Sequence, residues 1–179
     1  MVPKQCFLTK GVGRHREKLA SFEEALRRAG IANFNLVTVS SILPPHVIIE
    51  TRERGIGYLF PGEIVFCVMS RLETQEFGRQ IAVSCGLALP KDKSRYGYIS
   101  EHHAYGQSAK EAGDYAEDLA AGMLASTLGV EFDLDKAYDE RKEQYRFGGH
   151  IVGTRNVTQV AKGEPSVWTT VVSAVVFRF

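Results

Sequence analysis

The chain has 179 residues, 44% of them hydrophobic, which is enough for one domain with a substantial core and cramped for two. Its 22 basic and 21 acidic residues give a formal net charge of +1 and are scattered in short mixed groups, which argues against nucleic acid as a partner. No stretch approaches the roughly 20 apolar residues that span a membrane, and the first residues lack the apolar core of a signal peptide. We therefore expect a single-domain cytoplasmic protein with no membrane partner.

The cysteines add to this picture. Cys6, Cys67 and Cys85 lie in apolar surroundings, and their spacing is not that of the C-x-x-C motifs used for zinc or redox chemistry. An odd number of cysteines in a reducing compartment favours free thiols over disulfides. We expect these three residues to be buried structural thiols.

The first predicted elements are a strand, a loop and a helix. "CFLT", residues 6–9, predicts a strand, and "GVGRHREK" after it predicts a polar loop without the spacing of a nucleotide-binding motif. In "ASFEEALRRAG", Ser21 and Glu24 form a capping-box pattern, and Gly30 is well placed to end a helix in a left-handed conformation. The sequence therefore predicts a helix over about residues 21–29.

Strands dominate the rest of the chain. A long amphipathic helix is predicted over residues 108–129, opened by a second capping box from Ser108 to Glu111, and a third helix over 133–146. Segments rich in β-branched or aromatic residues predict strands over 63–70, 80–89, 95–102, 149–160 and 166–179. Because the strands between 63 and 102 follow one another without helical crossovers, the pattern favours an α+β layered sandwich over a βαβ nucleotide fold.

"NFNLVTVSSILPP", residues 33–45, predicts a strand that ends in a rigid turn. Alternation along an extended segment places Asn35 and Ser41 on the same face. Neither proline can donate a backbone hydrogen bond, and Pro44 restricts the residue before it, so the strand must end near Ser41. On these residues alone, a strand-to-turn transition with capping hydroxyls is the simpler interpretation.

The same serines allow a chemical interpretation. A serine hydroxyl held against the preceding carbonyl can attack it and convert the amide to an ester. β-Elimination and hydrolysis then leave a pyruvoyl group at residue 41, release ammonia, and cut the chain between Ser40 and Ser41. The attack needs hydrogen-bond donors for the developing oxyanion, and Asn35 is a candidate.

Several separated motifs resemble, in order, those of the pyruvoyl-dependent arginine decarboxylases. "FEEALRRAGIANFNLVTVSSILPP" matches a helix ending in A-G-I, followed by N-x-N-L, a strand and S-S-I-x-P-P, and "ALPKDKSRYGYISEHH" matches the later P-K-D-K and glutamate. The similarity covers about residues 19–130 and implies a layered αββα sandwich of mostly antiparallel sheets. It also implies a homotrimer of αβ units with active sites between neighbours.

The resemblance further implies a proenzyme that cleaves itself into a β chain, residues 1–40, and an α chain, residues 41–179. The covalently bound pyruvoyl group would derive from Ser41, so that neither pyridoxal phosphate nor a metal is needed. The expected reaction is that of a carbon–carbon lyase, which releases carbon dioxide from L-arginine and leaves agmatine for polyamine biosynthesis.

Roles for individual residues also follow from the resemblance. Glu101 matches the general acid, a role that requires a raised pKa because an ionised carboxylate cannot donate a proton. Glu23 matches the guanidinium-binding acid, although relatives with the closest motif carry aspartate there, and Leu26 matches a pocket wall. Asn35 matches a residue near the pyruvoyl group, and Ser40 matches the new β-chain terminus that helps to position substrate.

Two alternatives remain open. The longer side chain of Glu23 allows a pyruvoyl-dependent decarboxylase of another amino acid, and a trimeric binding protein that never cleaves is the other candidate. Adjacent strand residues point to opposite faces, which argues against a metal ion shared by His102 and His103, with His46 or His150 as further ligands. Instead, at least one histidine of this pair is expected to hydrogen-bond or tune Glu101.

Overall fold

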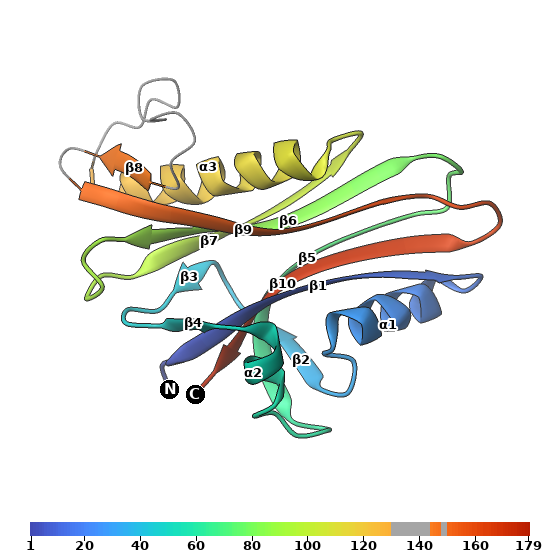
Figure 1. The fold of residues 1–179 in the computed structure, drawn as a ribbon, viewed down its shortest axis with the longest axis horizontal. Helices are drawn as coiled ribbons and strands as arrows, with labels where there is room; N and C mark the ends of the chain where they lie inside the picture. The colour runs from blue at the N-terminus through green and yellow to red at the C-terminus, as the bar shows by residue number, and fades with distance from the viewer. Residues whose placement is uncertain (130–143, 148–149) are drawn as a thin grey trace.

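A computed structural model describes residues 1–129, 144–147 and 150–179 of the chain. Two sheets stack face to face, and a helix covers the outer face of each (Figure 1). The elements in chain order are β1 (Gln5–His15), α1 (Lys18–Ala29), β2 (Asn35–Thr38), β3 (Ile42–Leu43), β4 (Ile48–Glu50), α2 (Arg52–Ile56), β5 (Ile64–Thr74), β6 (Gln80–Pro90), β7 (Gly97–Tyr105), α3 (Ala109–Thr127), β8 (Gln144–Phe147), β9 (His150–Lys162) and β10 (Trp168–Arg178).

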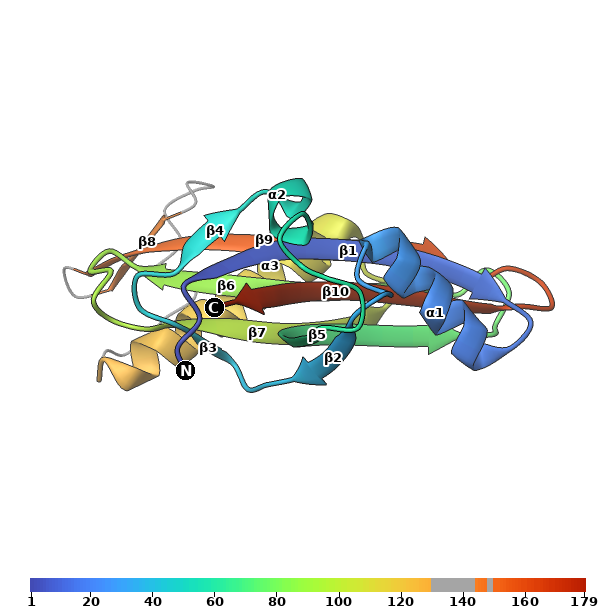
Figure 2. The same cartoon turned by 90° about the horizontal axis from the view of Figure 1, so that it is seen from below.

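The strand order is β2-β5-β10-β1-β4 in the first sheet and β3-β7-β6-β9-β8 in the second. The pairs β1–β4 and β2–β5 are parallel, and the other described pairs are antiparallel. Helix α1 packs on β1 and β10, and α3 packs on β6, β7 and β9 (Figures 1 and 2). The layers therefore run helix, sheet, sheet, helix, which confirms the α+β sandwich. No helix in the described ranges has the length and apolar character needed to cross a membrane.

Strand β1 is much longer than the predicted residues 6–9, and the predicted loop over residues 11–18 is wrong. Gly11 and Gly13 lie within β1, directly beneath α1. A Cβ atom on Gly11 would overlap the carbonyl oxygen of Ala25, and one on Gly13 would overlap that of Ser21. These glycines thus serve close packing of a helix on a strand and do not form a turn.

Helix α1 begins at Lys18, and the capping box predicted at Ser21 is wrong. Ser21 is buried within the helix, where its hydroxyl donates to the Lys18 carbonyl and lies 2.7 Å from the Thr170 hydroxyl oxygen. The Glu24 carboxylate accepts a hydrogen bond from the Arg14 N–H instead. Gly30 ends the helix at a φ of 79°, as predicted.

The later elements agree more closely with the sequence. The capping box of Ser108 and Glu111 is confirmed at the start of α3. The five later predicted strands correspond to β5, β6, β7, β9 and β10, whereas β4 and α2 were not predicted. The helix predicted over residues 133–146 falls largely outside the described residues, and its last part, from Gln144, belongs to β8.

The three cysteines are buried and free, as predicted. Burial raises the pKa of Cys6 and of Cys85 to about 12 and that of Cys67 to about 11. Cys6 and Cys85 belong to the apolar layer between the two sheets, and Cys67 belongs to the core beneath α1. They are therefore structural thiols of the sandwich.

Candidate active site

The segment from Val39 to Ser41 crosses from one sheet to the other. The strand predicted over residues 33–41 is shorter than expected. Strand β2, at the edge of the first sheet, ends at Thr38, and β3, at the edge of the second sheet, begins only at Ile42 (Figures 1 and 2). The Val39 N–H donates to the Cys67 carbonyl oxygen over 2.9 Å, and the Ile99 N–H donates to the Ser41 carbonyl oxygen over 2.7 Å. The crossing segment is thus held to a strand of each sheet.

A tight turn lies at the centre of this crossing. The Ile42 N–H donates to the Ser40 carbonyl oxygen over 3.0 Å, and a bond between residues two apart defines a γ-turn, here with Ser41 at its centre. Ser41 is not among the residues with positive φ, so the turn is of the common inverse form. Ser40 is exposed and Ser41 is half-buried. The peptide bond between the two serines is therefore fixed by its neighbours and open to solvent on one side.

An apolar pocket of about 380 Å³ adjoins the turn. Ser40 and Ile42 line one side of it, and Phe66, Phe177 and Phe179 are among the residues that complete it. The rings of Phe66 and Phe179 meet edge to face at 5.7 Å. None of the lining residues has an acidic side chain, so this pocket holds no side-chain partner for a substrate guanidinium.

Glu101 lies near the turn because Ile99, which is hydrogen-bonded to Ser41, is two residues before it on the same face of β7. Ile99 packs with Val68 and Val175 of the first sheet, and strand alternation directs Glu101 to the same inter-sheet side, about 7 Å further along the strand. Glu101 is exposed, yet after the effect of burial its charge also contributes to the raised pKa values of Cys67 and Cys85. The carboxyl group therefore acts on buried groups from the surface of the sandwich.

Burial raises the pKa of the Glu101 carboxyl, and the nearby His103 opposes this shift. The raised pKa is the direction that a proton donor needs, since it extends the pH range in which the acid form is present. His103 shares a strand face with Glu101 and is the histidine that influences it, in agreement with the prediction that one of the pair would do so.

His102 points the other way, towards α3. Its Nε2 atom lies 2.8 Å from Gln107 Oε1, and its ring packs against Tyr115 with the ring centroids 4.5 Å apart. In the part of the chain that the structure describes, no group of three or more His, Cys, Asp or Glu residues is arranged to hold a metal ion.

Asn35 is not close to the Ser40 carbonyl within this chain. Its Nδ2 atom donates to the Gly62 carbonyl oxygen over 2.7 Å, at the start of β2. Five residues of nearly extended chain separate it from Ser40, a distance of roughly 15 Å. The two backbone donors that do lie at the turn, from Ile42 and Ile99, were not predicted, because every residue except proline carries an N–H and no side-chain pattern marks them.

Glu23 and Leu26 lie on α1, apart from the turn. Helix α1 covers the first sheet towards one end of the sandwich, whereas β3 lies towards the other end (Figures 1 and 2). Glu23 Oε1 accepts a hydrogen bond from Arg27 Nε over 3.1 Å, and Leu26 is buried in the core beneath the helix. A single chain therefore brings Ser40, Ser41 and Glu101 together but does not bring Glu23 and Leu26 to them.

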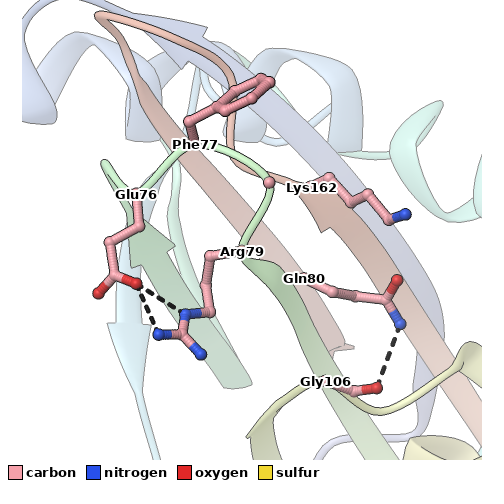
Figure 3. A pocket seen from close by; sticks show the side chains of 7 residues that line it. Glu76, Phe77, Arg79, Gln80, Gly106 and Lys162 are labelled. Atoms are coloured by element: carbon pink, nitrogen blue, oxygen red, sulfur yellow. Dashed lines mark hydrogen bonds and ion pairs between the residues drawn. The ribbon is translucent and has the colours of Figure 1, made fainter.

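A polar cleft of about 460 Å³ lies elsewhere, at the turn between β5 and β6 (Figure 3). Arg79 and Glu76 form an ion pair there at 2.7 Å, and Gln80 Nε2 donates to the backbone carbonyl of Gln107 over 2.8 Å. Gln80 and Leu87 are seven residues apart on β6, a distance of roughly 23 Å, and Leu87 is the strand partner of Ile99. This cleft contains none of the predicted site residues.

Comparison with known proteins identifies the family. Residues 5–179 match the family described as pyruvoyl-dependent arginine decarboxylase (PvlArgDC). A probable pyruvoyl-dependent arginine decarboxylase of Chloroherpeton thalassium is 58% identical over 176 residues, which cover 98% of this chain and 97% of that protein. The pyruvoyl-dependent arginine decarboxylase of Methanococcoides burtonii is 55% identical over 178 residues, 99% of each chain. This chain therefore belongs to the pyruvoyl-dependent arginine decarboxylase family, whose members are lyases.

Proposed function

We propose that this protein decarboxylates L-arginine to agmatine and carbon dioxide, and so supplies polyamine biosynthesis. Its pyruvoyl group would derive from Ser41 after the chain cuts itself between Ser40 and Ser41. The observation that carries the proposal is the fixed turn at these two serines beside Glu101, in a chain whose relatives are named for this reaction. The products would be a β chain of residues 1–40 and an α chain of residues 41–179.

The surroundings of Ser41 fit a pyruvoyl group. The side chain of residue 41 is half-buried beside an apolar pocket, and the Ile99 N–H would continue to hold the carbonyl oxygen of residue 41 after cleavage. When present, the pyruvoyl group supplies an electron-accepting carbonyl for the electrons of the bond to the departing carboxylate, the chemistry that pyridoxal phosphate supplies in other decarboxylases. The pocket places apolar side chains on one side of the turn, and the exposed Ser40 leaves the other side open to solvent.

The cleavage step uses the two serines themselves. The Ser41 Oγ atom attacks the Ser40 carbonyl carbon, its proton passes to the Ser41 nitrogen, and the C–N bond breaks to leave an ester. Loss of the Ser41 α-proton then expels the Ser40 carboxylate and leaves dehydroalanine at residue 41. Its tautomer reacts with one water molecule to give the ketone and ammonia, so that the atoms balance.

Glu101 is proposed as the proton donor. Loss of carbon dioxide leaves excess electron density on the substrate α-carbon, which must take up a proton before the product can leave. The raised pKa of the Glu101 carboxyl and its position one strand repeat beyond Ile99 support this role. The Ser40 carboxylate, newly formed beside the apolar pocket, would help to position the substrate.

The guanidinium site is proposed to be completed by a neighbouring subunit in a homotrimer of αβ units. The pocket beside Ser40 has no acidic side chain, while Glu23 lies on α1 with Leu26 beneath it and already accepts a hydrogen bond from the guanidinium of Arg27. Strand β2 covers the edge of β5 only as far as Cys67, and β3 covers the edge of β7 only as far as Ile99. Among the described strands, the remaining length of each edge has no partner. Open strand edges of this kind favour coverage by another chain.

The substrate assignment is tested by release of carbon dioxide from arginine, lysine and ornithine, with the product identified by mass spectrometry. Arginine should be the preferred substrate and agmatine the product. The longer side chain of Glu23 shortens the pocket, so that preferential turnover of a shorter amino acid would replace arginine in the proposal and leave the pyruvoyl chemistry standing. Absence of turnover together with an uncut chain would favour the non-catalytic alternative.

A further inference from the structure

The turn between β6 and β7 contacts the segment that follows β3. The P-K-D-K motif, residues 90–93, runs from the end of β6 into this turn, and none of its residues lines the apolar pocket. The His46 N–H donates to the Lys93 carbonyl oxygen over 2.9 Å, which joins the two turns. His46 has a φ of 57°, a left-handed conformation that a residue other than glycine keeps only where its surroundings hold it. The contact with Lys93 therefore helps to fix the chain just after the two prolines.

Asp92 determines the shape of the turn between β6 and β7. The Ser94 N–H and hydroxyl both donate to Asp92 Oδ1, over 3.0 and 2.7 Å, and the Arg95 N–H donates to the Asp92 carbonyl oxygen over 3.0 Å. An aspartate at the first position of a four-residue turn, bonded to the backbone two residues on, is a common turn-forming arrangement. Lys93 is the second residue of this turn, so its carbonyl is not used within the turn and accepts from His46. Hydrogen bonds from Ser94 lower the pKa of the Asp92 carboxyl, and the proximity of His46 adds to this shift.

Cleavage would change which contacts hold residue 41. In the intact chain the segment is also held to the first sheet, through the hydrogen bond from the Val39 N–H to the Cys67 carbonyl. Once the bond after residue 40 is cut, this contact belongs to the β chain and no longer restrains residue 41. The α chain then begins with the two-residue strand β3, in which Leu43 is buried, followed by two prolines that cannot donate a backbone hydrogen bond. Contacts with the second sheet must then fix residue 41.

We propose that Asp92 is a positioning residue for the pyruvoyl group of the cleaved protein, an inference that rests on the proposed function. Through the turn that it shapes, Asp92 presents the Lys93 carbonyl to His46, and the rigid prolines carry this restraint back to β3 and residue 41. A small displacement of a reacting group, caused by a substitution far from the chemistry, can lower the rate by large factors. Because Asp92 acts through the backbone, its influence should appear in kcat and in how firmly residue 41 is held.

The test compares three variants of the full-length chain. Asp92→Ala removes the acceptor for both Ser94 hydrogen bonds, whereas Asp92→Asn keeps an acceptor oxygen and should preserve the turn. Glu76→Ala is the matched control. Glu76 forms an ion pair with Arg79 in the turn at the opposite end of β6, with partners three residues apart, like the ion pair of Asp92. Intact-mass analysis measures cleavage, and kcat and KM for arginine are measured on the same preparations.

Asp92→Ala should lower kcat by about tenfold with little change in KM, while the chain is still cut between residues 40 and 41. Asp92→Asn and Glu76→Ala should stay within about twofold of the unmodified protein. An unchanged kcat in Asp92→Ala, or an equal loss in either of the other two variants, would overturn the inference and leave the proposed function intact. An unmodified chain that is never cut at this bond would instead contradict the proposed function.

A second measurement does not depend on turnover. The Ile99 N–H is bonded to the Ser41 carbonyl oxygen, so its rate of hydrogen exchange reports how firmly residue 41 is held. In the cut protein, Asp92→Ala should speed exchange at Ile99 by about tenfold. In the uncut Ser41→Ala chain, where Val39 still anchors the segment, the same substitution should have a smaller effect. An unchanged exchange rate at Ile99 in the cut protein would show that Asp92 does not position residue 41.

Discussion

The Ile99 N–H lies 2.7 Å from the carbonyl oxygen of Ser41, and this hydrogen bond attaches the turn to the strand that carries Glu101. Alternation along β7 then directs Glu101 to the same inter-sheet side as Ile99. Strand β7 therefore connects Ser41, the candidate source of the pyruvoyl group, to Glu101, the candidate proton donor.

Replacing Ser41 by alanine should abolish both cleavage and decarboxylation, because the attacking hydroxyl and the source of the pyruvoyl group are lost. Ser40→Ala is the matched control, since it keeps the Ser41 hydroxyl and should still cut between residues 40 and 41. Denaturing gel electrophoresis and an arginine decarboxylation assay measure the two outcomes. Activity in the Ser41→Ala protein would remove Ser41 from the mechanism.

Replacing Glu101 by glutamine should leave cleavage largely intact and lower kcat by about 10²- to 10⁴-fold, the usual contribution of a positioned general acid. The amide is nearly the same shape as the carboxylic acid but cannot deliver its proton. Chain composition and kcat are measured on the same preparation, so that defects in maturation and in turnover are separated. Normal turnover in this variant would eliminate Glu101 as the donor.

The pH dependence of kcat should follow the acid form of Glu101. Activity falls as the pH rises through the Glu101 pKa, and since burial raises that pKa, the fall should begin above the range of an ordinary glutamate. His103→Gln removes the side chain that opposes this shift, so the alkaline limb should move to higher pH. A limb that moves to lower pH would contradict the assigned influence of His103.

Arg27 pairs with Glu23 over 3.1 Å on α1 and would compete with a substrate guanidinium for that carboxylate. Exposed pairs of this kind are worth at most about 1 kcal/mol, so Arg27→Gln should lower the KM for arginine by about twofold with little change in kcat. Arg28→Gln is the control, because Arg28 pairs with Glu24 instead. An increase in KM for Arg27→Gln alone would indicate that Arg27 assists binding.

The contact between β1 and α1 predicts a sharp difference between two glycines. Gly13→Ala should destabilise the protein by about 1–3 kcal/mol or more, because the new Cβ meets the Ser21 carbonyl and the helix must move outward. Gly57→Ala should cost much less, since Gly57 has a helical φ of −63° and a Cβ there would lie 3.3 Å from the Glu53 carbonyl oxygen, a tight contact that a shift of a few tenths of an ångström relieves. Urea unfolding of both variants measures the free energy of unfolding, and equal losses would contradict the packing described here.

Local signals in the sequence were reliable where residues close in sequence alone determine the structure. Gly30 acts at the end of α1 and the capping box of Ser108 and Glu111 at the start of α3, and both were predicted correctly. The capping box at Ser21 failed because that serine is buried against Thr170, a residue 149 positions away that no local pattern reveals. Tertiary packing overrode the local motif.

The site was predicted only in part, because its arrangement also depends on contacts between distant segments. The prolines predicted a turn near Ser41, but not that β2 ends already at Thr38 or that β3 follows the turn. The crossing between two sheets depends on the pairing of β2 with β5 and of β3 with β7. The sequence motifs also grouped Glu23 and Leu26 with Ser41, whereas the single chain holds α1 apart from the turn. Motifs indicate which residues belong to one chemistry, and under the proposed trimer Glu23 and Leu26 would come from a neighbouring copy of the chain.

The measurement that tests the central claim most directly is intact-protein mass spectrometry under denaturing conditions, with and without borohydride reduction. We predict one fragment of residues 1–40 and a second chain that starts at residue 41, lacks a free amino terminus, and gains hydrogen on reduction. A single chain of full mass, or a second chain with an ordinary amino-terminal serine, would contradict the conversion of Ser41 into a pyruvoyl group.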